Sequence, residues 1–171
     1  ISLKPALFPL HVWLPNAYAY APSFATAFLA GTATKAAIYL LIRFYFSIFA
    51  VAIPFQSLPI EDIVLVLSLA AMFIASFAAI FEKNAKRMLA YSSVAQVGYI
   101  TLGIALANKM GLAGSLVHIF NHAIMKTALF FALGAMVYRT GFATLPNLAG
   151  IGRKMPITTA AFVVAGMGLI G

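Results

Sequence analysis

Long apolar stretches, separated by short polar turns, dominate the pattern along this chain. A helix needs about 20 consecutive apolar residues to cross a bilayer. Four stretches reach that length and predict membrane-spanning helices over residues 23–46, 61–81, 86–107 and 112–138. The pattern therefore predicts an all-α fold, a polytopic transmembrane helix bundle in which short turns make neighbouring helices antiparallel.

Two shorter apolar stretches lie toward the ends of the chain. Residues 4–15 carry three prolines, which remove backbone donors, and they predict half of a broken helix. Residues 156–171 begin with a proline at the first helical position and predict a partial span. We interpret residues 1–171 as a single transmembrane domain that is a piece of a longer polytopic protein.

The composition agrees with a lipid-embedded chain. Hydrophobic residues make up 64% of it and charged residues 8%, whereas soluble domains average about 45–50% apolar and about 25% charged residues. The absence of cysteine excludes disulfides, iron–sulfur clusters and thiolate metal sites within the chain. The net charge is +8, but the basic residues do not form a stripe with interleaved aromatics. We therefore expect the chain to contact the lipid bilayer and not nucleic acid.

The basic residues outside the membrane are divided unevenly between its two sides. Antiparallel helices place the turns at 82–87 and 139–154 on one side, and Arg43 and Lys109 on the other. The first side holds Lys83, Lys86, Arg87, Arg139, Arg153 and Lys154. This bias predicts that the loops 82–87 and 139–154 are cytoplasmic in a multi-pass protein of a bacterial inner or plasma membrane.

Three lysines remain that no loop accounts for: Lys4, Lys35 and Lys126. A lysine at the centre of a membrane helix costs ~2.5–3.5 kcal/mol on insertion scales. All three acids of the chain lie at the ends of predicted helices. The partners of the lysines are therefore expected to be waters, histidines or acids outside this chain.

Two histidines and a lysine share one face of the fourth predicted span. His118, His122 and Lys126 are four residues apart, so each step turns the helix by about 40° and rises about 6 Å. Ser115 extends the line. Histidine exchanges protons near physiological pH, and a lysine in apolar surroundings can change its charge state. This ladder favours a proton relay in which single waters bridge the steps.

Other interpretations of the ladder stay open. A single intramembrane histidine is often only a helix–helix hydrogen bond. His118 and His122 have the spacing of a zinc pair, but no acid or cysteine at that depth completes the ligand set. Haem ligation would make the chain a membrane-anchoring part of a redox complex, although bis-histidine ligation needs histidines on facing helices. We expect no cofactor and no metal, and keep haem or metal binding as the alternative.

A second polar stripe, formed by Ser92, Gln96 and Tyr99, follows the third predicted span. These side chains line a channel or hydrogen-bond neighbouring helices. Lys35 and Lys4 also have structural alternatives. Lys35 would cap a carbonyl of a broken neighbour, and Lys4 would mark the water boundary.

Five motifs together resemble a known family. In chain order they read KPALFPLHVWLPNAYAYAP, LAGTATKAAIYLLIR, NAKRMLAYSSVAQVGY, HIFNHAIMKTALFF and LAGIGRKMP. They resemble the antiporter-like proton-translocating subunits of respiratory complex I (NADH:quinone oxidoreductase), energy-converting hydrogenases and Mrp-type sodium/proton antiporters. The resemblance covers essentially the whole chain, and its details are closest to the D-type protein of Mrp antiporters or its hydrogenase relatives.

The resemblance implies a fold and a set of roles. The fold would be part of a fourteen-helix, inverted-repeat bundle, with broken helices at both ends of this window. Lys4 resembles the lysine at the first break, and Lys35 the connecting lysine. His118, His122 and Lys126 resemble the central ladder toward the second half-channel.

The resemblance also implies function and partners. The chain would move protons, with sodium as an alternative coupled ion, beside other membrane subunits. It would not be catalytic alone, but a non-redox component of a translocating oxidoreductase or of an antiporter.

Overall fold

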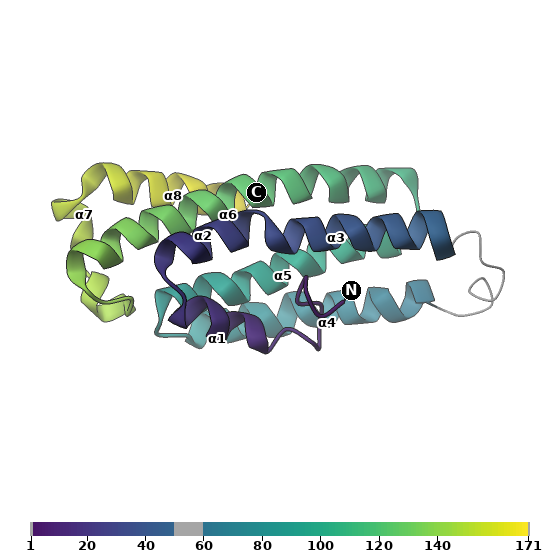
Figure 1. Cartoon of the computed structure of the whole chain (residues 1–171), viewed down its shortest axis with the longest axis horizontal. Coiled ribbons are helices and arrows are strands. Elements are labelled where there is room, and N and C mark those ends of the chain that lie inside the picture. Colours follow the sequence, from purple (N-terminus) through teal and green to yellow (C-terminus); the bar gives the residue numbers. More distant parts are fainter. Residues whose placement is uncertain (1, 50–59, 171) are drawn as a thin grey trace.

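The computed structural model describes residues 2–49 and 60–170, and its regular elements are all helical in those ranges (Figure 1). In chain order the elements are α1 (Trp13–Tyr20), α2 (Ser23–Gly31), α3 (Ala33–Arg43), the π-helical turn η1 (Phe44–Phe49), α4 (Ile60–Phe81), α5 (Ala85–Ala105), α6 (Lys109–Thr140), the 3-10 turn η3 (Leu145–Leu148), α7 (Ile151–Lys154) and α8 (Pro156–Ile170).

The long helices run side by side along the long axis of the molecule (Figure 1). α5 packs against α1, α4 and α6, and α6 also packs against α2 and α8. The main core is apolar and includes Leu89, Val94, Leu129, Phe130 and Leu133. Most of α5 is buried, while α4 turns most of its surface outward, as expected for a helix that faces lipid.

Side-chain caps define where the two central helices begin. The Asn84 side-chain oxygen accepts hydrogen bonds from the backbone N–H groups of Lys86, at 2.9 Å, and Arg87, at 3.3 Å. Asn108 accepts in the same way from Gly111, at 2.6 Å. At the other end of α6, Gly141 takes the left-handed conformation that commonly ends a helix. α6 is therefore longer at both ends than the apolar stretch 112–138 indicates.

The helix predicted over 23–46 is interrupted, which the apolar pattern did not indicate. α2 ends at Gly31, the backbone of Thr32 is distorted to a φ of −119°, and α3 begins at Ala33. Gly31 faces Thr127 of α6 so closely that a β carbon would overlap the Thr127 side chain. The close approach requires glycine, and helices bend most easily at such residues.

The half helix predicted over 4–15 is also different in the structure. Residues 2–12 form successive turns, and the helix begins at Trp13 and continues to Tyr20. Pro5 and Pro9 lack the N–H groups that a helix over this stretch would use, whereas Pro15 lies in the first turn of α1, where no such donor is needed.

Backbone hydrogen bonds join the two loops that were predicted to lie on one side. The Ala85 N–H donates to the Ala143 carbonyl at 2.8 Å, and the Leu145 N–H donates to the Lys83 carbonyl at 3.0 Å. The loops 82–87 and 139–154 therefore lie at the same end of the bundle.

Lys86 was counted among the loop cations, but the structure buries it. Its side chain is 7% exposed, and its ammonium donates to the carbonyl of Ala21, just past the end of α1, at 3.0 Å. This cation therefore holds α1 to the start of α5.

We expect Lys86→Met to destabilise the protein by about 1–3 kcal/mol, because it leaves the Ala21 carbonyl without this donor. Thermal unfolding of the detergent-solubilised complete protein would measure the effect. Lys83→Met is the matched control, because the Lys83 side chain is exposed. Equal unfolding temperatures for the two variants would contradict the capping role.

Candidate functional site

Lys126 lies at the centre of the site and is fully buried. Its ammonium donates to the Leu89 carbonyl at 2.8 Å and to the Ser92 hydroxyl, both on α5. The acids of the chain lie at the start of α4 and at Glu82, just after its end. The ammonium is thus held by neutral oxygens, which can also stabilise the uncharged amine.

Lys35 is the second buried lysine, at 6% exposure on α3. Its ammonium donates to the carbonyl of Ala30, at the end of α2. The sequence left open that Lys35 caps a carbonyl of a broken neighbouring helix. The structure shows such a contact, but the interrupted helix is the one that carries Lys35 itself. Lys35 also lies close enough for its charge to act on His122 and Lys126.

His122 is fully buried one helical turn before Lys126, and neither ring nitrogen has a hydrogen-bond partner among the described residues. Its ring is parallel to that of His118, with ring centroids 5.9 Å apart and an interplanar angle of 9°. Because neither His122 nitrogen has a partner in the described part of the chain, no direct hydrogen bond joins the two rings. A proton moving between them therefore needs a bridging group, as the spacing along the helix predicted.

Gln96 of α5 connects His118 to the end of α8. Its amide oxygen lies 2.6 Å from His118 Nε2, and its amide nitrogen donates to the Leu169 carbonyl at 3.2 Å. Tyr99, the next residue of the predicted stripe, is 49% exposed, and its ring centroid lies 6.4 Å from that of His118.

Ser115 and Lys4 lie away from this cluster, and Tyr99 lies at its exposed edge beside His118. Ser115 is buried and donates to the Ile100 carbonyl at 2.8 Å, next to Gly103, so it holds α5 against α6. Lys4 is exposed, and it precedes α1 by two turns of irregular backbone. The structure thus gathers the following predicted residues: Lys35, Ser92, Gln96, His118, His122 and Lys126.

The backbone acceptors of this site had no signal in the sequence. The carbonyls of Leu89 and Leu169 are ordinary helix groups, and only the packing of α5 against α6 and α8 brings them to Lys126 and Gln96. A buried lysine does indicate that some oxygen lies nearby, but it does not indicate which one.

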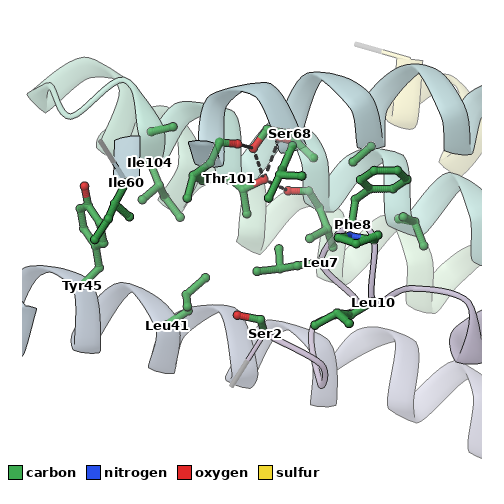
Figure 2. Close-up of a pocket in the computed structure, with 18 of the residues that line it drawn as sticks. Ser2, Leu7, Phe8, Leu10, Leu41, Tyr45, Ile60, Ser68, Thr101 and Ile104 are labelled. Atoms are coloured by element: carbon green, nitrogen blue, oxygen red, sulfur yellow. Dashed lines mark hydrogen bonds between the residues drawn. The ribbon is translucent and has the colours of Figure 1, made fainter. Parts of the chain in front are cut away.

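A cavity of about 370 Å³ lies apart from these groups, between α3, α4, α5 and the N-terminal segment (Figure 2). Its walls are mostly apolar. At its wall the Ser68 hydroxyl donates to the Thr101 hydroxyl at 2.7 Å, and Thr101 donates to the Val97 carbonyl of its own helix. None of the six gathered residues lines it.

The geometry does not favour metal or haem ligation by the histidines. In the described part of the chain no three His, Cys, Asp or Glu side chains are grouped to hold a metal ion. His118 and His122 lie parallel on one helix face, so they cannot bind an iron from opposite sides.

Comparison with known proteins gives matches that cover this chain from end to end. The family model described as "NADH:quinone oxidoreductase/Mrp antiporter, TM" matches residues 1–171. NADH-quinone oxidoreductase subunit N of Desulforudis audaxviator is 42% identical over 100% of this chain and 34% of its own length. Subunit M of Rickettsia prowazekii is 32% identical over 99% of this chain and 34% of its own length.

Two solved structures match with equal closeness. A chain of the Mrp complex from Dietzia sp. has a TM-score of 0.88 at 34% identity, covering 99% of this chain and 31% of its own length. A chain of the membrane-bound sulfane sulfur reductase, an archaeal respiratory membrane complex, has a TM-score of 0.88 at 31% identity, covering 97% and 34%. The chain thus spans about a third of the length of its relatives.

Proposed function

The chain belongs to the NADH:quinone oxidoreductase/Mrp antiporter transmembrane family, and we propose that it carries protons within the membrane through the buried lysines and histidines of α3 and α6. It is an integral, multi-pass membrane protein, with four stretches long and apolar enough to cross a bilayer in the described ranges: α4, α5, α6, and Ser23–Ser47, in which α2, α3 and η1 follow one another. The observation that carries the proposal is a fully buried Lys126 beside a fully buried His122, with only neutral oxygens around the ammonium.

Electrostatic repulsion between Lys35 and Lys126 would couple proton uptake at one lysine to proton release at the other. Lys35 and Lys126 are both buried, and like charges interact strongly where the dielectric constant is low. A proton arriving at Lys35 therefore favours release of a proton from Lys126, and the reverse. His122 is buried one turn from Lys126 and can accept or donate at either nitrogen, because neither is engaged by a described residue.

We assign the remaining groups to entry and positioning. Lys4 is exposed and in this proposal exchanges protons with the groups that feed Lys35. Ser92 orients the Lys126 ammonium. Tyr99 is half exposed, and in this proposal its hydroxyl hydrogen-bonds the water that reaches His118.

The relatives indicate which kind of protein would contact this chain. The matched proteins are components of an NADH-quinone oxidoreductase, an Mrp complex and an archaeal respiratory complex. We propose that other membrane subunits contact this chain, that sodium is an alternative coupled ion, and that redox chemistry belongs to those partners. Even without Lys86, the joined loops 82–87 and 139–154 carry five basic residues, against Arg43 and Lys109 at the other end, which supports a cytoplasmic location for the loops.

Substitution of Lys35 tests the proposal. We expect Lys35→Ala in the complete protein to remove most proton transport, because no other group on α3 can take its place in the relay. The decay of an imposed pH gradient in vesicles, at matched protein abundance, would measure this. Arg43→Ala is the matched control, since Arg43 is an exposed cation two turns further along α3. Unchanged transport in Lys35→Ala would refute the relay.

A further inference from the structure

The Gln96 side chain joins three helices at one point. It extends from α5, its amide nitrogen donates to the Leu169 carbonyl on α8, and its amide oxygen lies against His118 Nε2 on α6. The contact to His118, at 2.6 Å, is among the shortest polar contacts of the bundle. Both ends of one amide are therefore engaged, each by a different helix.

The chemistry of these partners fixes which way the amide points. A backbone carbonyl can only accept a hydrogen bond, so the Leu169 oxygen must face the amide NH₂ group. The opposite orientation would bring two acceptor oxygens together at this position. The amide oxygen therefore faces His118, and it too can only accept.

The same logic then reaches the imidazole ring. A group that faces an acceptor must donate, so His118 Nε2 carries a hydrogen. A neutral imidazole has one donor and one acceptor nitrogen, which leaves Nδ1 as the acceptor. When His118 takes up a second proton, that proton must go to Nδ1, and the bond to Gln96 is kept in both charge states.

We propose that Gln96 is a positioning residue for His118: anchored on the Leu169 carbonyl of α8, it holds a hydrogen on Nε2 and leaves Nδ1 as the nitrogen that accepts and releases the relayed proton. This inference rests on the proposed proton relay. While the contact with α8 is intact, His118 stores and returns a proton at one nitrogen. Passage of a proton from one ring nitrogen to the other requires Gln96 to let go, which links that passage to the position of α8.

Nitrogen NMR of the imidazole rings tests the assignment without any transport measurement. The complete protein would carry ¹⁵N-histidine in lipid bilayers, and the signals lost in His118→Gln would identify those of His118. We expect wild-type His118 to show one-bond N–H coupling at Nε2 in both its neutral and its charged form. In the neutral form we expect Nδ1 to carry no hydrogen. A hydrogen on Nδ1 with a bare Nε2 in the wild type would overturn the proposal.

Two variants at position 96 separate positioning from simple packing. Gln96→Met keeps the length of the side chain but removes both hydrogen-bonding groups, so we expect the neutral ring to lose its single form and to divide its hydrogen between both nitrogens. Gln96→Glu keeps an acceptor and should keep the hydrogen on Nε2. If Gln96→Met leaves the ring unchanged, Gln96 only packs the helices and the proposal fails. The proposed relay is tested separately by transport in Lys35→Ala, so the failure of one does not imply the failure of the other.

Discussion

Replacing Lys126 with arginine should abolish proton transport as completely as replacing it with alanine. Arginine keeps the positive charge but cannot release its proton in a protein. If Lys126 works by changing its charge state, both variants lose the step, and a lost proton-transfer group typically costs ~10²–10⁴-fold in rate. If Lys126 is a structural cation, arginine should be tolerated and alanine should be harmful.

The two outcomes are distinguished by transport in vesicles at matched protein abundance. Lys109→Arg is the control for the same chemical change, because Lys109 is exposed in the first turn of α6. Active transport by Lys126→Arg would exclude a proton-transfer role for Lys126, whatever the alanine variant does.

Gly103→Val should separate α5 from α6 and eliminate the assembled protein or its activity. A β carbon on Gly103 would lie 2.8 Å from the Gly111 carbonyl oxygen and would overlap the Ser115 hydroxyl. The carbonyl belongs to the backbone of α6 and cannot rotate away. Overpacking of this kind typically costs ~1–3 kcal/mol, and here it also shifts the helix pair that carries Ser92, Gln96, His118 and Lys126.

Gly114→Val provides the comparison for this effect. Gly114 lies on α6 one turn from Gly111, and apart from its own stretch of helix no atom of the described residues lies within 4 Å of the position where its β carbon would be. We expect Gly114→Val to accumulate in the membrane at close to the wild-type level and Gly103→Val to be lost, measured by immunoblot and size-exclusion profile. Normal accumulation and transport in Gly103→Val would show that the helices need not approach this closely.

The helices of this fold are predictable because lipid imposes a simple length requirement. The stretches 61–81 and 86–107 correspond to α4 and α5 within two residues at each end, since only a long apolar helix satisfies its backbone in hydrocarbon. The interruption at Thr32 was not predictable, because it lies where Gly31 closely approaches Thr127, almost a hundred residues away along the chain.

The sequence predicted the ladder of ionisable residues on α6 but not the hydrogen-bond partners that hold the site. Helical periodicity alone places His118, His122 and Lys126 on one face, and the structure keeps them there. Gln96 and Ser92 appeared only as a polar stripe of undecided purpose, because their partners are decided by how α5 meets α6 and α8. Lys86 was misplaced for a related reason: a lysine beside a turn resembles a solvated loop residue unless its carbonyl partner, here Ala21, is known.

The length of α6 has a consequence for the surrounding lipid. At 32 residues and about 1.5 Å per residue, the helix is about 48 Å long, whereas the hydrocarbon layer is about 30 Å thick. Even a tilt of about 40°, the upper end of what is common, leaves about 37 Å along the membrane normal. Part of α6 must therefore project beyond the hydrocarbon, and the position of the membrane–water interface along the helix depends on the bilayer. A thinner membrane brings this interface closer to Lys126, and a thicker one moves it away. The thickness of the host membrane therefore sets how far a proton must travel without bulk water.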